Sequence, residues 1–74
     1  MTTVYKYRLD AIPGQFCESY IYLYPSGKIE LRISHLQDNN VLNFETSQWI
    51  SAERMFKFKK DNEDNFVEKY EEKY

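Results

Sequence analysis

The fold is decided by residues 16–33, which read FCESYIYLYPSGKIELRI. Two alternating runs flank a turn that contains Pro25 and Gly27. Pro sets the φ angle of a type I turn, and Gly accepts the left-handed position that follows it, so the segment predicts a three-residue hairpin loop with a bulge. This loop places Tyr24 opposite Lys28 and thereby fixes the pairing of the two strands.

The predicted register sorts the side chains into two faces. One face carries aliphatic pairs: Leu23 with Ile29 and Ile21 with Leu31. The other face, called the tyrosine face below, carries tyrosines and charges: Tyr20, Tyr22, Tyr24, Lys28, Glu30 and Arg32. Since a strand buries one face and exposes the other, we expect the aliphatic face to form the core and the tyrosine face to form the surface.

A first strand is predicted over Val4–Ala11, where Tyr5, Tyr7 and Leu9 alternate with Lys6, Arg8 and Asp10. The turn that follows, residues 12–15, contains Pro13-Gly14 and suits a type II turn. Two registers stay open. In one register Tyr5 and Tyr7 face the core and Lys6 and Arg8 join the tyrosine face. In the other, a two-residue loop reverses these sides.

A fourth strand is predicted over Val41–Glu45, after a turn rich in Asp and Asn at residues 37–40. Pairing across that turn would place Leu42 opposite Gln37 and Phe44 opposite His35. Both apolar side chains would then extend the core face.

The C-terminal third is predicted to cover the apolar face with helices. One helix, capped by Thr46 or Ser47, would present an apolar stripe: Trp49, Ile50, Ala52, Met55 and Phe56. A fifth strand over Arg54–Lys60 is an alternative. A second, amphipathic helix would run from Asn62 or Asp64 to the C-terminus, with a stripe of Phe66, Val67, Tyr70 and Tyr74.

These elements predict one α+β domain over residues 1–74. A four-stranded antiparallel meander, spanning about residues 4–45, would be packed on one face by one or two short helices within 47–74. At 74 residues, a core this small leaves little room for a deep pocket.

Composition argues against several kinds of site. One Cys and one His, Cys17 and His35, can form neither an internal disulfide nor a zinc centre. We expect Cys17 to be a small buried hydrophobe and His35 a packed or rim residue. A calcium loop starting at Asp61 is rejected because Phe66 and Lys69 occupy positions that need Gly and an oxygen donor. We therefore expect no enzyme activity, no metal and no cofactor.

The chain lacks an apolar run long enough to cross a membrane and an evident signal peptide. We expect a soluble protein that is complete from Met1 and resides in the cytoplasm or another reducing compartment.

The functional hypothesis is a small non-catalytic protein-binding module: an accessory subunit, adaptor or inhibitor, of the kind found among viral or other accessory genes. Tyr and Arg often dominate binding energy at interfaces, which favours the tyrosine face as the contact surface. The expected partner-binding residues are Tyr20, Tyr22, Tyr24, Lys28 and Arg32.

Three alternatives stay open. Single-stranded nucleic acid could stack on the same face, with Lys6 and Arg8 adding charge, although the chain carries a formal net charge of −2. An acidic helix could mimic nucleic acid through six carboxylates: Asp61, Glu63, Asp64, Glu68, Glu71 and Glu72. The chain could also form a homo-oligomer through an exposed edge, either the first or the fourth strand.

Overall fold

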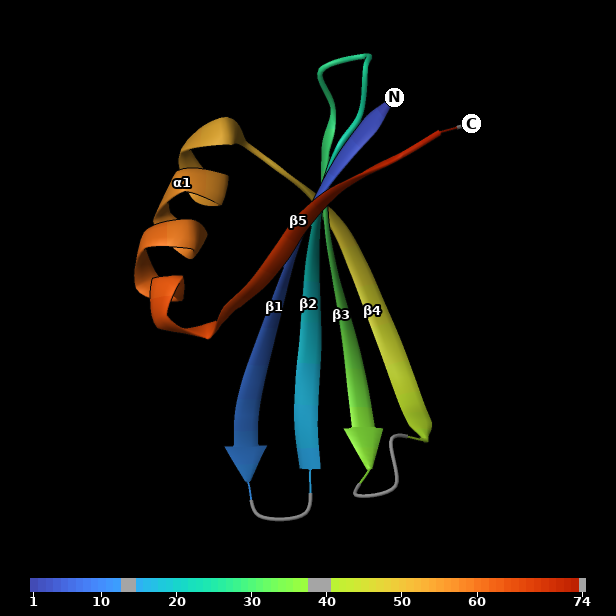
Figure 1. Cartoon of the computed structure of the whole chain (residues 1–74), viewed down its shortest axis with the longest axis vertical. Coiled ribbons are helices and arrows are strands. Elements are labelled where there is room, and N and C mark those ends of the chain that lie inside the picture. The colour runs from blue at the N-terminus through green and yellow to red at the C-terminus, as the bar shows by residue number, and fades with distance from the viewer. Residues whose placement is uncertain (13–14, 38–40, 74) are drawn as a thin grey trace.

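The computed structural model describes residues 1–12, 15–37 and 41–73. Over these residues the chain forms five strands, one α-helix and one short 3₁₀ turn (Figure 1). In chain order they are β1 (Thr2–Ile12), β2 (Gln15–Leu23), β3 (Ile29–Gln37), β4 (Leu42–Ile50), α1 (Ala52–Asp61), η1 (Glu63–Asn65) and β5 (Phe66–Glu72). The predicted α+β class with an antiparallel sheet is confirmed, but the sheet has five strands instead of four.

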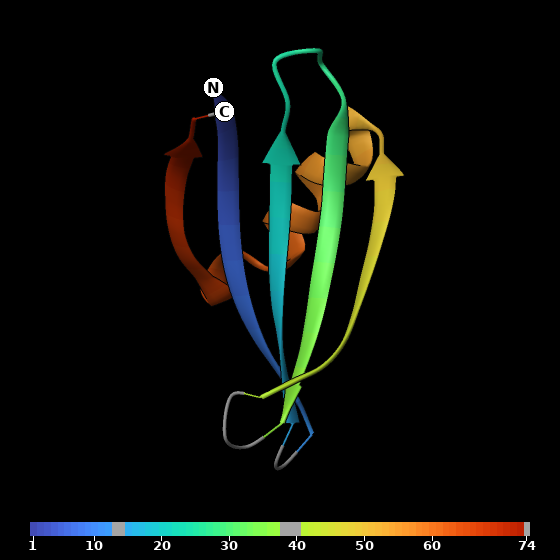
Figure 2. The same ribbon diagram turned by 90° about the vertical axis from the view of Figure 1, so that its right-hand side faces the viewer.

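The strands form one antiparallel sheet in the order β4-β3-β2-β1-β5. Helix α1 leaves the edge strand β4 and crosses behind the sheet toward β5 at the opposite edge (Figure 2). The helix therefore covers one face and leaves the other face of the sheet open.

The core lies between α1 and the sheet. Met55 on the helix is 5% exposed and packs with a cluster from the three central strands: Tyr7, Ile21, Ile29 and Leu31. Phe58, one turn further along α1, meets the ring of Tyr7 edge-on at a centroid distance of 5.3 Å. The aliphatic face predicted from residues 16–33 is thus the core face.

The hairpin between β2 and β3 matches its prediction. Gly27 has a φ of 92°, the left-handed region that glycine enters without strain. The backbone N–H of Tyr24 donates to the carbonyl of Lys28 at 3.0 Å, and that of Gly27 donates to the carbonyl of Tyr24 at 2.9 Å. Tyr22 lies opposite Glu30, so the three tyrosines share the face away from α1.

The β1–β2 register settles the choice left open by the sequence. Tyr5 pairs with Ile21 and Tyr7 pairs with Ser19, which puts both tyrosines on the core face. A two-residue connection alone would put these tyrosines on the other face. A register shift between Asp10 and Ile12, just before the connection, keeps them on the core face. Residues 13–14 of the connection lie outside those that the structure describes.

The β3–β4 register is partly as predicted. His35 pairs with Phe44, but Leu42 pairs with Leu36 instead of Gln37 because the register shifts between His35 and Leu36. The predicted turn at residues 38–40 lies outside the described residues.

The start of the helix was predicted too early. Strand β4 continues to Ile50, so neither Trp49 nor Ile50 belongs to a helical stripe. Helix α1 begins after Ser51, whose Oγ accepts a hydrogen bond from the backbone N–H of Arg54 at 3.1 Å. The alternative of a strand over residues 54–60 is wrong, because α1 occupies them.

The predicted C-terminal helix is wrong. Its residues form η1 and then β5, which pairs with β1 from Thr2↔Glu72 to Tyr7↔Phe66. Pairing satisfies the backbone groups along the outer edge of β1, a gain that local periodicity cannot reveal.

The predicted acidic helix is wrong for the same reason. Its six carboxylates are spread over three elements: Asp61 ends α1, Glu63 and Asp64 lie in η1, and Glu68, Glu71 and Glu72 lie on β5. Adjacent β5 residues point to opposite faces of the sheet, so these acids do not form one continuous surface.

Candidate binding face of the sheet

Four aromatic rings form a continuous row on the tyrosine face. Tyr20 and Tyr22 have ring centroids 6.2 Å apart, and Tyr22 and Tyr24 have centroids 6.1 Å apart. The row ends on Trp49 of β4, whose ring meets that of Tyr24 at 5.9 Å. Strand alternation explains the positions of Tyr20 and Tyr22, because every second residue of β2 points to the same side of the sheet, and Tyr24 follows directly after the end of β2 at Leu23.

Trp49 is the member of the row that the sequence did not predict. Its side chain is 63% exposed because β4 carries it along the open face as far as Ile50. The available signal was the length of β3. Strand β3 begins at Ile29, so the backbone groups in its first half would lack a partner on this side if β4 ended at Glu45.

Tyr22 is buried, although we expected it at the surface. Only 7% of it is exposed, and burial raises the pKa of its hydroxyl. The guanidinium Cζ of Arg32 lies 4.4 Å from the ring centroid, and Arg32 Nη1 donates to the Tyr22 hydroxyl at 3.4 Å. Tyr20 and Tyr24 are partly exposed, so these two tyrosines and Trp49 provide the accessible aromatic surface.

The tyrosines act as a second, smaller core. Val4 lies on the face without the helix, yet none of its surface is exposed. Its cross-strand neighbours are Tyr22 on β2 and Tyr70 on β5, two side chains large enough to cover it. Burial also raises the pKa of Tyr70.

A buried carboxylate holds the centre of the face together. Glu30 is 8% exposed and accepts hydrogen bonds from the hydroxyls of Ser47, at 2.6 Å, and Tyr24. Arg32 Nη2 donates a third hydrogen bond to the Glu30 carboxylate, at 3.1 Å. Burial acts to raise the pKa of Glu30, but these hydrogen bonds and the Arg32 charge outweigh it and hold the pKa below its usual value.

The predicted cations of the face already have partners. Lys6 Nζ lies 2.9 Å from the Glu18 carboxylate, and this hydrogen bond raises the Lys6 pKa. Arg8 lies over the ring of Phe16, with 4.1 Å between its Cζ and the ring centroid. Lys28 extends over Trp49, its Nζ 5.4 Å from the ring. The structure therefore places these three bases on one face, where Lys6 forms an ion pair and the exposed Arg8 and Lys28 lie over aromatic rings.

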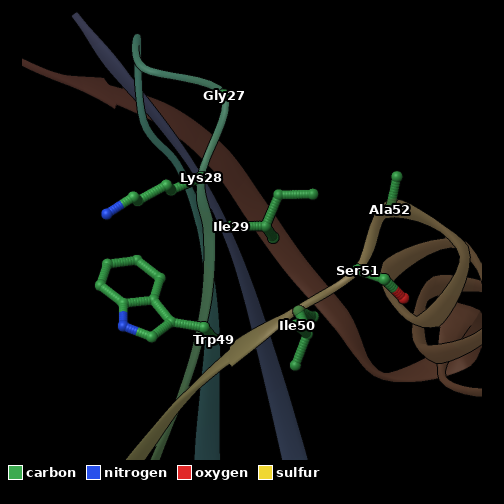
Figure 3. A pocket seen from close by; sticks show the side chains of 7 residues that line it. All are labelled: Gly27, Lys28, Ile29, Trp49, Ile50, Ser51 and Ala52. Atoms are coloured by element: carbon green, nitrogen blue, oxygen red, sulfur yellow. The ribbon is translucent and has the colours of Figure 1, made fainter.

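An open pocket of about 320 Å³ lies beside Trp49, between the Gly27 turn and the start of α1 (Figure 3). Lys28 and Trp49 project together on one side of it, and Ile29 and Ile50 project on the side of the helix (Figure 3). The pocket shows that the aromatic row ends at a hollow instead of a flat rim.

Cys17 and His35 lie on the opposite face of the sheet. Their Sγ and Nδ1 atoms are 3.2 Å apart across β2 and β3, and both residues are half-buried. The His35 ring stacks on Phe44 with 4.1 Å between centroids. The expected packed position of His35 is confirmed, whereas Cys17 is less buried than we expected.

Within residues 1–12, 15–37 and 41–73, no three side chains of His, Cys, Asp or Glu gather to hold a metal ion. In the same residues, no helix has both the length and the apolar character needed to cross a bilayer.

Comparisons with protein-family models, with curated proteins and with solved structures found no match to this chain.

Proposed function

We propose that the chain is a small non-catalytic module that binds another protein through the open face of its sheet. The observation that carries this proposal is the contact between Tyr24 and the highly exposed Trp49, which extends the aromatic row to the rim of the face. Large aromatic side chains with few rotatable bonds supply much of the energy of protein interfaces.

The contact surface in this proposal has an aromatic centre and a polar border. Its centre consists of Tyr20, Tyr24 and Trp49, and its border includes Lys28 and Arg32. Tyr22 is buried below this surface, and its ring packs against those of Tyr20 and Tyr24 and supports them. Because the rings are packed against one another, they lose little side-chain freedom when a partner binds.

Charge pairing supports a protein over a nucleic acid as the partner. Nucleic-acid binding draws its affinity from cations that neutralise phosphates. On this face, Lys6 and Arg32 already form ion pairs with Glu18 and Glu30. A protein partner does not require those cations to be released.

Quantitative capture from host lysate, with tagged protein as bait and mass spectrometry as readout, tests the proposal. Trp49→Ala and Tyr20→Ala should each reduce recovery of the same partner at least tenfold, since each removes a hot-spot contact of more than about 1.4 kcal/mol. Phe56→Ala is the matched control, because Phe56 is also 63% exposed but lies on α1, on the other side of the sheet.

The result is decided by the comparison among variants. Equal recovery by Trp49→Ala, Tyr20→Ala and wild type would overturn the proposal, as would loss of the partner with Phe56→Ala alone. The chain contains a single Trp, so the purified partner should also shift Trp49 fluorescence. A fluorescence change with a single-stranded oligonucleotide, weakening steeply as salt rises, would instead favour nucleic acid.

A further inference from the structure

The two edges of the sheet differ sharply in charge. Strand β5 reads FVEKYEE, with four charged residues in seven. Strand β4 reads LNFETSQWI, with Glu45 as the one charged residue in nine. Exposed edges are normally protected against pairing by charged side chains, especially Lys, and by Pro. The edge at β5 carries this protection, and the edge at β4 does not.

Strand β4 is exposed along nearly its whole length. Every residue from Leu42 to Trp49 is exposed. Three of them are large and apolar, with exposed fractions of 55% for Leu42, 51% for Phe44 and 63% for Trp49. Figure 2 shows β4 at the border of the sheet, with no strand on its outer side among those described. An edge with this composition favours addition of another strand.

We propose that two copies of this chain pair through β4, antiparallel and around a two-fold axis at Ser47. The axis stands perpendicular to the sheet, so the two five-stranded sheets become one continuous sheet with both helices on the same face. Pairing extends over the regular part of the strand, from Phe44 to Ile50, beyond the shift opposite His35.

This register is self-complementary. Phe44 of one copy faces Ile50 of the other on the helix side. Thr46 faces Gln48 on the same side. On the open side Glu45 faces the indole of Trp49 and never a second carboxylate. Each of these three pairs occurs twice because the interface is two-fold, and an aromatic side chain directly opposite a β-branched one, as Phe44 is opposite Ile50, stabilises a sheet.

Moving the axis by one residue loses this match. An axis at Thr46 would place Phe44 against the amide of Gln48 and would remove the apolar pair. The position of Glu45 also suits the Ser47 axis. Its carboxylate accepts a hydrogen bond from Ser34 at 3.0 Å and lies 4.0 Å from Arg32, so it is held toward β3 and away from the edge. A second copy fits β4 because the strand complements itself.

Light scattering coupled to size exclusion, over a concentration series, tests the dimer. Wild type should approach twice the 9.0 kDa chain mass as concentration rises. The double variant Thr46→Lys with Gln48→Lys should stay monomeric, because the new ammonium groups face each other across the axis. The double variant Thr46→Glu with Gln48→Lys should dimerise, because opposite charges then face each other at the same positions.

The charge pairs make the test specific for the register. Both double variants are compared by thermal unfolding, and Val67→Lys on β5 is the control for adding a cation to an edge. A wild type that is monomeric up to its solubility limit would overturn the proposal. So would identical behaviour of the two double variants while both are folded. Positions 46 and 48 point away from the tyrosine face, so loss of the dimer with retained capture of a partner separates this inference from the proposed function.

Discussion

The guanidinium of Arg32 lies over the ring of Tyr22, and its Nη1 donates a hydrogen bond to the Tyr22 hydroxyl. The second terminal nitrogen, Nη2, pairs with the buried carboxylate of Glu30. One side chain thus connects the aromatic row on β2 with the carboxylate on β3. A cation that reads from the sequence as a free surface charge is in fact part of the packing of the open face. This arrangement ties one of the positive charges of the face to the packing of its rings.

Replacing Tyr22 with Ala should lower the free energy of unfolding by about 3 kcal/mol, the order expected when a buried aromatic side chain is truncated. The ring is 7% exposed and lies beside Val4, which would gain contact with water. Urea denaturation followed by circular dichroism measures the change. Tyr20→Ala, at a partly exposed position of the same strand, should cost clearly less, and equal costs would contradict the assignment of Tyr22 to a second core.

Acidification should weaken the fold through Glu30. Its pKa in the folded protein lies below the ordinary value of 4.5, so its stabilising contribution is complete above that value. The contribution is lost as pH falls through the folded pKa, because the unfolded state takes up its proton first. The difference in unfolding free energy between wild type and Glu30→Gln should therefore shrink below about pH 4.5.

The measurement is a set of denaturation curves at several pH values. Glu53→Gln, at an exposed position in the first turn of α1, serves as the comparison. A difference between wild type and Glu30→Gln that stays constant down to pH 3, about one unit below the ordinary range, would contradict the role of the Glu30 hydrogen bonds.

Removing the cap of α1 should destabilise the protein modestly. Ser51→Ala leaves the Arg54 N–H without its 3.1 Å acceptor and should cost about 1 kcal/mol. Ser51→Asp keeps an acceptor oxygen and should restore most of the loss. Thermal unfolding of the three proteins checks the order, and a Ser51→Asp variant as unstable as Ser51→Ala would mean that the hydrogen bond is not the cause.

Two neighbouring helix residues should respond very differently to truncation. Met55 is 5% exposed and packs in the main core, so Met55→Ala should cost about 3 kcal/mol. Phe56 is 63% exposed, so Phe56→Ala should change stability by less than about 0.5 kcal/mol. Chemical denaturation measures both, and similar values would contradict the orientation of α1 on the sheet.

The sequence was most informative where turn chemistry and strand alternation agreed. The Pro25 and Gly27 hairpin fixes the pairing of Tyr22 with Glu30 within a few residues of the turn, so local rules suffice. The same pairing predicted the core face, because alternation assigns each side chain once the register is known.

Elements that depend on pairing between residues far apart in the sequence could not be predicted from local patterns. Phe66 and Tyr70 have a spacing typical of a helix, yet β5 forms because β1 offers it an unpaired edge. The exposed position of Trp49 depends in the same way on the length of β3. Sequence pattern alone also placed Tyr22 on the correct face without showing that Arg32 and the neighbouring rings would bury it.

The pairing of Thr2 with Glu72 has a consequence for synthesis on the ribosome. Strand β5 is the last of these elements to emerge, so β1 must remain without its outer neighbour while β2, β3, β4 and α1 are being made. Contacts between residues so distant in sequence also form slowly. During translation the nascent chain therefore exposes an open edge at β1 until the last strand arrives.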